Sequence, residues 1–554
     1  MFSRRPLQGF FVGLALCAMA MTNTFAFAPY SWTMLPLLTL AILALTLTTA
    51  TSKRQAAWYG FAYGVGWFAT GVSWVHVSIA TFGGMPLIAS LSIMALLVLY
   101  LALYPLLAGV LFHLLQQRAP ALTALSFAAS WTLAENLRSW MLTGFPWLSL
   151  GYSQTESWYG PWASLVGENG ITFILALTAA LPVMLWREQR WQQLSSDKPA
   201  LLQTAVVVLF AAFSPMLSSG VSATGQVQSV ALVQGNIKQE LRWDPEQALP
   251  TMKKYMDLTK PVLSNRLIIW PEAGVPQLEP LAQGYLINLD MQAQEQNTAV
   301  VTGILDAKRN GDAYNGMIVL GQQDPKIPTA SYYYETRNRY QKHHLLPIGE
   351  FVPFESLLRD VAPFFDLPNS SFARGPWLQP NLVAKGYHLL PALCFEIAFP
   401  RQILANFTKQ TDFILTVSND AWFGDSHGPW QHLQIAQMRA REFGRPVLRA
   451  TNNGVTAVID ANGKIRQQLP QFADAVLTDD VPLYQGQTFY SQLGDWPLYV
   501  VWFALALGIA IPWWQQRRLS PAPFKAPNAP APLQVEPKAP PALDKPRERI
   551  EPKF

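Results

Sequence analysis

The sequence predicts a polytopic α-helical membrane protein of about eight transmembrane helices, with an α/β domain inserted between the last two. Three observations favour this fold class. Half of the 554 residues are hydrophobic and 14% are charged, which is too apolar for an ordinary soluble enzyme. The apolar residues cluster in runs of roughly 20 residues, each long enough to cross a bilayer as a helix. The segment at about 220–491 instead spreads its charges and alternates strand-like with helix-like patterns.

Eight apolar runs are the candidate transmembrane helices. They are 7–26, 31–51, 56–77, 86–115, 121–140, 163–186, 200–218 and 492–514. The first run could also be a cleaved signal peptide, because Arg4 and Arg5 precede it and the small-residue sequence "AFA" follows at 26–28. A polytopic protein needs no removable signal, so we expect this run to remain as a helix.

Basic residues are distributed unevenly among the loops. If the spans alternate, the Lys and Arg residues fall on one side, and the short loops at 27–30, 78–85 and 141–162 carry none. Because cytoplasmic loops retain Lys and Arg, both termini are predicted to be cytoplasmic and the inserted domain external. The predicted domains are 1–219 for helices one to seven, 220–491 for the external domain, 492–516 for helix eight and 517–554 for a disordered tail rich in Pro and charge.

The external segment has the pattern of a layered α/β domain. Its β-branched or apolar runs of strand length are 229–234, 266–272, 298–305, 315–321, 386–396, 412–420 and 446–460. Helical patterns lie between several of them, at 246–264, 281–296 and 429–443. Strands that alternate with helices over about 270 residues indicate a domain with its own hydrophobic core.

Cys394 ends an apolar run in "LLPALCFEIAFP", at 389–400. The chain's other cysteine, Cys17, lies in the first predicted span and cannot reach it, so Cys394 is predicted to be an unpaired thiol in an oxidising compartment. A buried free cysteine often serves as a small hydrophobe. From the thiol alone, a structural and a catalytic role are equally supported.

Two further reactive side chains follow strand-like runs. Glu272 ends "RLIIWPE", and Lys342 follows "YYYETRNRYQ". Strand ends are where an α/β sheet presents residues that face a ligand. With Cys394, the trio would serve acyl transfer, in which Glu takes the thiol proton, Cys attacks a carbonyl and Lys stabilises the oxyanion. Taken singly, a Glu or Lys at a strand end is more often a solvated surface charge.

The motifs around these residues carry a family resemblance. "WPE", "KHHLLPIGEFVPFE" and "LCFE", followed by "SNDAWFGDSHGPWQH" and "RATNNGVT", resemble the nitrilase superfamily. With seven predicted spans before them and one after, the chain is similar to the membrane-bound branch of that superfamily, the apolipoprotein N-acyltransferases. The resemblance implies a nitrilase-like αββα sandwich and the catalytic triad Glu272, Lys342 and Cys394. It also implies Glu350 as a supporting carboxylate and Trp243 near the substrate site.

Two residues beside Cys394 are further candidates. Phe395 stands where relatives commonly have a tyrosine, so the phenol hydroxyl is absent here and any role for it is open. Glu396 could line the pocket, help to position Cys394, or satisfy a buried backbone group, and we favour the pocket.

The resemblance also implies a reaction. An acyl chain passes from a phospholipid, with phosphatidylethanolamine preferred by similar family members, to a thioester on Cys394. It then passes to the α-amine of S-diacylglyceryl-cysteine on an apolipoprotein, the last step of lipoprotein maturation. We expect a monomer in the bacterial inner membrane, with its catalytic domain in the periplasm.

Two alternatives to this function remain open. A membrane-anchored nitrilase-type amidase could hydrolyse a small amide with the same triad, but about eight spans are more than an anchor requires. A catalytically inactive lipid-binding scaffold would not need to retain all three triad residues. The histidines lack the spacing of zinc ligands, and no Gly-rich phosphate loop or nucleic-acid motif is present, so we expect no metal, cofactor or nucleic acid.

Overall fold

A computed structural model describes most of the chain. The described residues are 4–82, 85–116, 119–187, 201–206, 219–242, 244–264, 266–308, 311–327, 330–347, 349–351 and 372–519. Contacts divide the chain into two compact units, Met1–Leu505 and Ala506–Phe554. The predicted seventh span and the predicted C-terminal tail lie largely outside the described residues.

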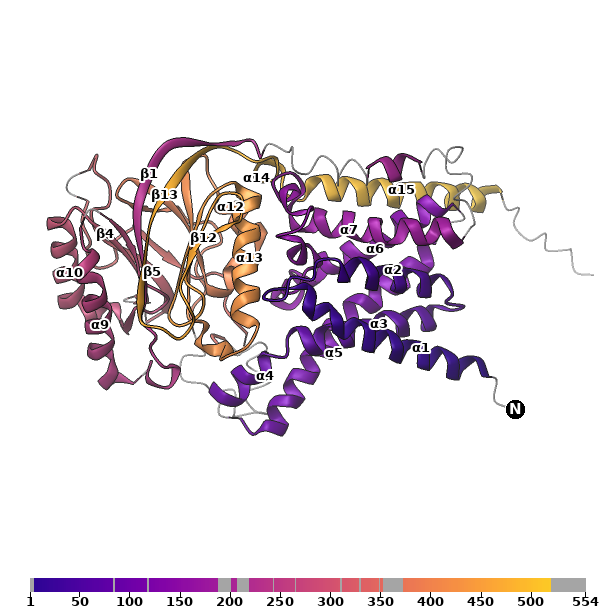
Figure 1. Ribbon diagram of the computed structural model, residues 1–554, viewed down its shortest axis with the longest axis horizontal. Coiled ribbons are helices and arrows are strands. Elements are labelled where there is room, and N and C mark those ends of the chain that lie inside the picture. Colours follow the sequence, from indigo (N-terminus) through magenta and orange to yellow (C-terminus); the bar gives the residue numbers. More distant parts are fainter. Residues whose placement is uncertain are drawn as a thin grey trace, which may run out of the picture. The chain divides into compact units, whose positions relative to one another are not determined.

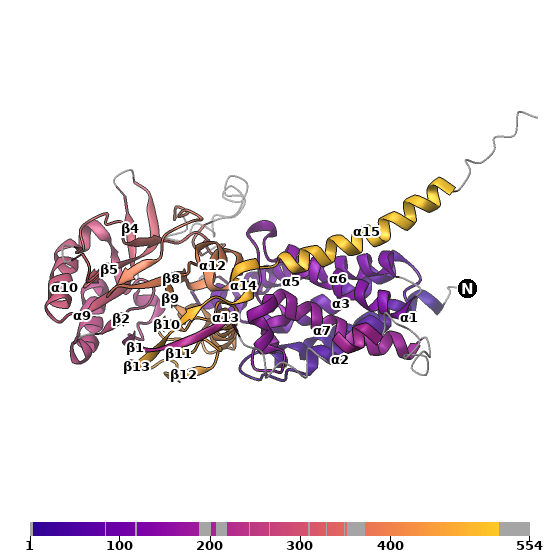
Figure 2. The same ribbon diagram turned by 90° about the horizontal axis from the view of Figure 1, so that it is seen from above.

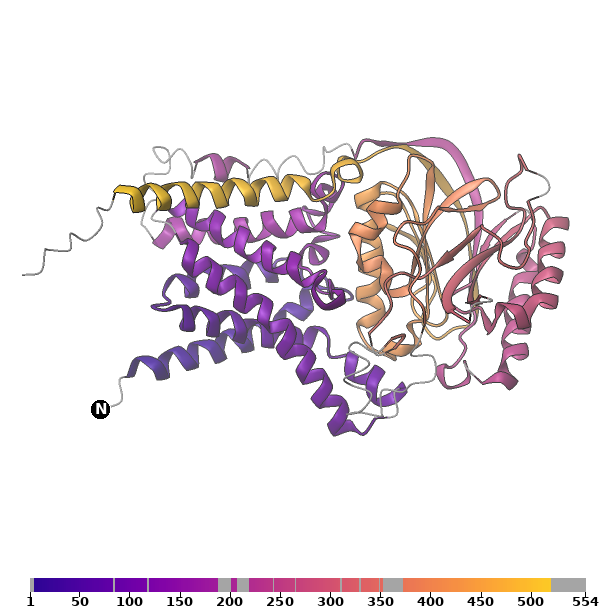
Figure 3. The same ribbon diagram turned by 180° about the vertical axis from the view of Figure 1, so that it is seen from behind.

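The N-terminal region is helical, as predicted (Figures 1 and 3). Its helices are α1 (Arg4–Ala20), α2 (Leu35–Thr48), α3 (Lys53–Gly71), α4 (Val75–Val77), α5 (Leu87–Leu115), α6 (Pro120–Arg138) and α7 (Ala163–Arg187). Within the described residues, three stretches are long and apolar enough to cross a membrane, namely Leu7–Ala26, Leu87–Leu115 and Gly160–Arg187. Helix α2 and the start of α15 (Trp496–Leu519), Trp496–Leu507, are apolar but shorter.

Close helix packing holds the N-terminal region together. A Cβ atom added to Gly60 of α3 would lie 2.2 Å from the carbonyl oxygen of Pro105 in α5, and one added to Gly66 would lie 2.0 Å from that of Cys17 in α1. Backbones can approach this closely only where the side chain is absent, a packing mode typical of membrane helices. Glycine therefore sets the position of α3 between its two neighbours.

The α/β domain is built on two sheets. The first has the strand order β13-β1-β2-β4-β5-β6, with β3 paired to β4, and the second has the order β12-β11-β10-β9-β8-β7. The strands of the first sheet are β1 (Val221–Gln234), β2 (Leu267–Ile269), β3 (Val275–Leu278), β4 (Ala299–Ala307), β5 (Ala313–Gly321), β6 (Arg339–Gln341) and β13 (Ala475–Gly486). Those of the second are β7 (Leu382–Ala384), β8 (Tyr387–Leu393), β9 (Thr411–Ser418), β10 (Val447–Thr451), β11 (Ala457–Ile459) and β12 (Ile465–Gln468).

Helices cover the outer face of each sheet (Figures 1 and 2). One hydrophobic core lies between the sheets and draws side chains from both, such as Ile269 of β2 and Leu415 of β9. A second core joins the first sheet to α9 (Pro245–Thr259) and α10 (Gln283–Glu295). A third joins the second sheet to α12 (Pro400–Asn406) and α13 (Gly428–Phe443), and continues into the N-terminal helices.

The predicted α/β domain is confirmed, and each quoted strand-like run contains a strand. The run at 446–460 contains two, because β10 turns back into β11 as an antiparallel hairpin. Strands β8, β9 and β10 are mutually parallel, as are β1, β2 and β4. Their carboxyl ends therefore lie at one edge of each sheet, where ligand-facing residues gather.

Candidate active site

Glu272, Lys342, Glu350 and Cys394 come together at the strand ends. Lys342 follows β6 directly, and its Nζ lies 2.7 Å from Oε2 of Glu350 and 3.9 Å from Oε1 of Glu272. Cys394 follows β8, and the charges of Glu272 and Lys342 both act on its thiol. The structure therefore brings the three predicted triad residues and the supporting carboxylate into one site, while Trp243 lies outside the described residues.

Asn315 of β5 links the two carboxylates. Its Nδ2 donates hydrogen bonds of 2.7 Å to Oε1 of Glu272 and 2.7 Å to Oε1 of Glu350. Each carboxylate also accepts a backbone N–H, Glu272 from Asn419 at 2.9 Å and Glu350 from Leu346 at 2.8 Å. Hydrogen bonds to the charged form stabilise a carboxylate. The cluster therefore fixes two carboxylates around one ammonium.

Lys342 is held as a cation by these neighbours. Burial alone would lower its pKa, but the charges of Glu350 and then Glu272 outweigh that effect and raise the pKa of Lys342 above its ordinary value. An ammonium carries three N–H donors, and Glu350 engages one of them at short distance. Lys342 can therefore donate to a negative oxygen that forms beside Cys394.

Cys394 has the backbone of a strained turn. Its φ of 54° lies in the left-handed region, which costs a residue with a side chain about 1–3 kcal/mol. Burial and the charge of Glu272 raise the pKa of the thiol to about 12, although Lys342 opposes the shift. At neutral pH the thiol is protonated, so the reaction needs a base such as Glu272 to take its proton.

Glu396 joins the nucleophile strand to the chain that follows Lys342. It is fully buried, and its carboxylate accepts backbone N–H groups from Leu393, His343 and His344. The hydroxyl of Tyr340 and the amide of Gln402 also donate to it, at 2.9 Å and 3.0 Å. Both oxygens are thus occupied by protein donors, which places Glu396 behind the site as a support.

Phe395 packs against aromatic residues of the N-terminal region. Its ring lies 6.3 Å from that of Trp147, in a stacked arrangement, and 6.4 Å from that of Phe145. The Arg138 guanidinium holds this segment in place, because it donates to the carbonyl oxygens of Phe145 and Trp147, each at 2.6 Å. One side of the nucleophile therefore has an apolar wall to which both regions of the chain contribute.

Comparisons with known proteins show the family to which the chain belongs. Residues 19–181 match the family model "Apolipoprotein N-acyltransferase N-terminal domain", and 229–489 match that of the carbon-nitrogen hydrolases. The apolipoprotein N-acyltransferase of Vibrio vulnificus is 46% identical over 93% of this chain and 98% of its own length. The chain belongs to the apolipoprotein N-acyltransferase family. As a family member, it is an acyltransferase of lipoprotein biosynthesis.

Other relatives extend the comparison. The apolipoprotein N-acyltransferase of Shewanella oneidensis is 46% identical over 88% of this chain and 93% of its own length. Among solved structures, a mutant amidase of Nesterenkonia AN1 from the nitrilase superfamily covers 50% of this chain and 98% of its own, at 15% identity and a TM-score of 0.35. Membership in the apolipoprotein N-acyltransferase family rests on the sequence matches.

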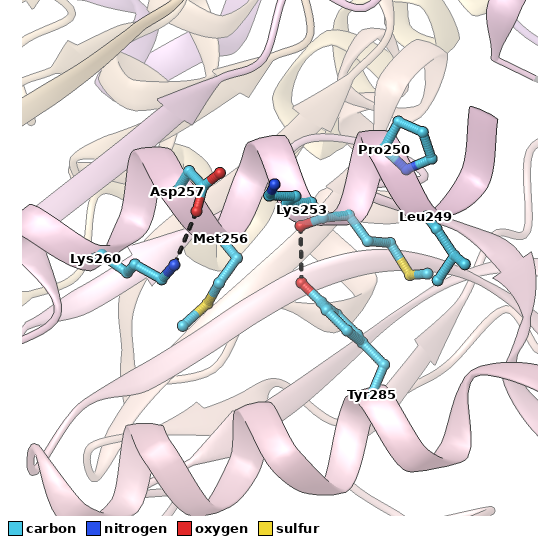
Figure 4. A pocket seen from close by; sticks show the side chains of 8 residues that line it. Leu249, Pro250, Lys253, Met256, Asp257, Lys260 and Tyr285 are labelled. Carbon is cyan, nitrogen blue, oxygen red and sulfur yellow. Dashed lines mark hydrogen bonds and ion pairs between the residues drawn. The ribbon is translucent and has the colours of Figure 1, made fainter.

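One further feature of this family member lies away from the triad. A groove of about 640 Å³ runs between α9 and α10, and its lining includes Met256 and Tyr285 but no triad residue (Figure 4). Across the described ranges, no group of three His, Cys, Asp or Glu side chains is placed to hold a metal ion.

Proposed function

We propose that Cys394 carries the acyl chain as a thioester between a phospholipid and an apolipoprotein. Glu272 is the general base, Lys342 the oxyanion donor and Glu350 the carboxylate that holds Lys342. The observation that supports this most strongly is the buried Lys342 ammonium, held by two carboxylates beside an unpaired thiol. Glu396 and Phe395 support the nucleophile, and Trp243 is proposed to lie near the substrate.

The first half of the reaction acylates the enzyme. Glu272 takes the thiol proton, and the Cys394 sulfur attacks the ester carbonyl of the phospholipid. Lys342 stabilises the oxyanion, the C–O bond of the ester breaks, and the proton passes from Glu272 to the departing alkoxide. The products are the Cys394 thioester and a lysophospholipid, with phosphatidylethanolamine as the proposed donor.

The second half transfers the chain to an amine. The α-amine of S-diacylglyceryl-cysteine attacks the thioester, Glu272 takes a proton from the nitrogen, and the C–S bond breaks as the amide forms. The proton then returns to the Cys394 sulfur, which restores the thiol. The apolar wall of Phe395, Trp147 and Phe145 beside the nucleophile suits lipid substrates and helps to keep water from the thioester.

The proposed setting is the bacterial inner membrane. We propose about eight spans, with 1–219 and 492–516 in the membrane, 220–491 in the periplasm, and both termini and the tail 517–554 in the cytoplasm. The protein is proposed to act as a monomer. An impermeant protease added to intact spheroplasts should cut within 220–491 and spare both termini, and cleavage of the tail would overturn this topology.

The decisive experiment detects the thioester by mass spectrometry. After exposure to phospholipid alone, the Cys394 peptide should gain a fatty-acyl mass that neutral hydroxylamine removes, and a diacylglyceryl peptide with a free α-amine should discharge it. Cys394→Ala should abolish the adduct, whereas the matched variant Cys17→Ala should keep it. An amidase would lose the adduct to water without any amine. A stable acyl group on another residue would refute the assignment.

A further inference from the structure

A buried cluster lies directly behind the nucleophile, and the mechanism above leaves it unused. It consists of Ser418, Asp420, His432 and Arg449, which come from the motifs "SNDAWFG", "GPWQH" and "RATNNGVT". The solvent exposure of Ser418, His432 and Arg449 is 0% and that of Asp420 is 2%. Burying two opposite charges is costly unless they are paired and hydrogen-bonded, so a role for the cluster has to be sought in its contacts.

Ser418 touches the reacting atom. Leu393 of β8 is in register with Val417 of the parallel strand β9, so the residues that follow them, Cys394 and Ser418, are neighbours. The Ser418 hydroxyl lies 3.3 Å from Sγ of Cys394 and 2.5 Å from Oδ1 of Asp420. Within the part of the chain that the structure describes, Ser418 is the hydrogen-bond partner of the Cys394 Sγ.

The Ser418 hydroxyl has one proton, so it can donate to only one of these two neighbours at a time, Sγ of Cys394 or Oδ1 of Asp420. While Cys394 is a thiol, its S–H can donate to Oγ of Ser418, and the Ser418 O–H donates to the Asp420 carboxylate. Once Cys394 is a thiolate, it has no proton to donate, and the Ser418 O–H can turn to the sulfur. Asp420 would still keep its 2.6 Å hydrogen bond from Arg449.

The rest of the cluster holds this arrangement in place. His432 Nε2 lies 3.0 Å from the carbonyl oxygen of Cys394, and its Nδ1 lies 3.1 Å from both Nη2 of Arg449 and Oδ1 of Asp420. A neutral ring that donates from Nε2 to the carbonyl accepts at Nδ1 from Arg449. Burial and then the charge of Arg449 lower the pKa of His432, in keeping with a neutral ring. The carbonyl bond fixes the left-handed turn at Cys394. A Cβ at Gly454 would lie 2.3 Å from Oδ2 of Asp420, so that glycine makes room for the carboxylate.

We propose that Ser418 is a catalytic residue that donates a hydrogen bond to the Cys394 thiolate, and that Asp420 holds its proton in the resting state. The proposal rests on the proposed function, in which Cys394 is the nucleophile. No bond to Ser418 forms or breaks: its proton only changes acceptor as the sulfur gains charge when Glu272 takes the thiol proton, and changes back when the thiol is restored. The same hydrogen bond stabilises the sulfur as it leaves during transfer to the amine.

Several charges act on Cys394 and have to be considered in any test of thiolate formation. Glu272 and Asp420 oppose the thiolate, whereas Lys342 favours it. Arg242, which donates to the carbonyl oxygen of Glu272 at 2.9 Å, also interacts with the Cys394 charge. A variant of Asp420 therefore removes an opposing charge and a competitor for the Ser418 proton at the same time. A variant of Ser418 removes a donor. The two should act in opposite directions.

The test measures alkylation of Cys394 by iodoacetamide at pH 8 in a Cys17→Ala background, where it is the sole thiol. Ser418→Ala should slow alkylation about three- to tenfold, because loss of about one pKa unit of thiolate stability is partly offset by higher intrinsic nucleophilicity. It should also slow thioester formation about tenfold. Asp420→Asn should instead speed alkylation. Ser418→Thr keeps the hydroxyl and should restore the parent rate of alkylation.

Thr416→Val is the matched control. Thr416 lies two residues earlier on β9, is buried, and its hydroxyl has no hydrogen-bond partner among the described residues, so the change should leave both rates unaltered. Equal alkylation rates in the parent and Ser418→Ala would overturn the proposal, even if the parent forms its thioester normally. If Ser418→Ala does not fold, slower or unchanged alkylation in Asp420→Asn would overturn it. Absence of a thioester in the parent would instead refute the proposed function.

Discussion

Two buried clusters in this protein share one composition, a cation with two carboxylates, and differ in what surrounds it. The active-site cluster is Lys342 with Glu272 and Glu350. The interface cluster is Arg439 of α13 with Glu442 of α13 and Glu168 of α7. Arg439 lies 3.1 Å from Glu442, and Oε1 of Glu442 accepts the backbone N–H of Glu168 at 2.8 Å. The interface cluster therefore ties the α/β domain to the N-terminal helices.

Protein donors reach the carboxylates of both clusters, and the groups around the cation distinguish them. Asn315 and two backbone N–H groups satisfy the active-site carboxylates, which leaves N–H donors of Lys342 free to face a substrate. In the interface cluster, Arg439 donates a hydrogen bond of 3.0 Å to the Tyr152 hydroxyl. Its Nε has no hydrogen-bond partner within the described part of the chain. Arg439 thus also has an unused donor, and Glu442 also accepts a protein donor, so position is what differs: the charge of Lys342 acts on the Cys394 thiol, whereas Arg439 contacts Glu442 and Tyr152. The comparison teaches that a buried charge cluster serves chemistry when its cation lies beside a reacting group.

Removing the cation should separate the clusters most clearly. Lys342→Ala should slow thioester formation by about 10²–10³-fold, the usual loss when one oxyanion donor is removed. Arg439→Met should leave the acylation rate per folded molecule within about threefold, because Arg439 contacts Glu442 and Tyr152 and not Cys394. The same substitution should lower the unfolding temperature, because it leaves buried carboxylates without their cation. Single-turnover acylation and thermal unfolding in detergent measure the two effects. Equal rate losses in both variants would break the comparison.

Changing Glu350 tests whether the carboxylates keep Lys342 charged. Glu350→Gln can still accept from Leu346 but loses its charge, so the pKa of Lys342 should fall and acylation should slow about 10–100-fold. The alkaline limb of the rate profile should also move to lower pH, since Lys342 then loses its proton earlier. A pH–rate profile from single turnovers would show both effects. An unmoved alkaline limb would argue against Lys342 as the group that titrates there.

Much of this site could be predicted from the sequence, because its residues follow recognisable strands. Glu272, Lys342 and Cys394 each come after a strand-like run, and strand ends meet at one sheet edge. Ser418 also stands at a strand end, after "DFILTV". A serine has no obvious role beside a Glu, Lys and Cys triad, so the sequence gave no reason to select this residue. Asn315 was missed because it lies within a strand, where a single polar residue is indistinguishable from a solvent-facing one.

The helical region was harder to predict in detail. The predicted spans outside 200–218 each overlap a helix, but hydropathy could not show that α2 has only 14 residues. In the α/β domain, the sequence likewise gave no sign that backbone N–H groups would occupy the Glu396 carboxylate. The position of Trp147 beside Phe395 could not be predicted either, because it depends on contacts between segments far apart in the sequence. Tertiary contacts of this kind leave no local pattern in the chain.

Asn315 offers a smaller perturbation of the active-site cluster. Asn315→Ala removes the amide that donates to both Glu272 and Glu350, while both carboxylates keep their backbone donors. We expect acylation to slow about tenfold, the equivalent of one net hydrogen bond to a charged group. Asn288 is exposed on α10, so Asn288→Ala is a control for loss of a surface amide and should not change the rate. A loss as large as that of Lys342→Ala would mean that Asn315 acts on the substrate directly.

The smallest effect concerns pH and the interface cluster. Burial raises the pKa of Glu442 from 4.5 to about 7, although Arg439 opposes the shift. The folded protein therefore holds a proton that the unfolded chain releases, so this group's contribution to stability is present below pH 4.5 and is lost as pH rises through about 7. The loss is at most on the order of 3 kcal/mol. Asp420, whose pKa the Arg449 guanidinium lowers to about 2 against the effect of burial, loses its contribution only in acid. Thermal unfolding in detergent should therefore show a few degrees of destabilisation between pH 5 and pH 8, and Glu442→Gln should flatten that slope. A slope of the same size in Glu442→Gln would assign the titration to another group and remove this distinction between the clusters.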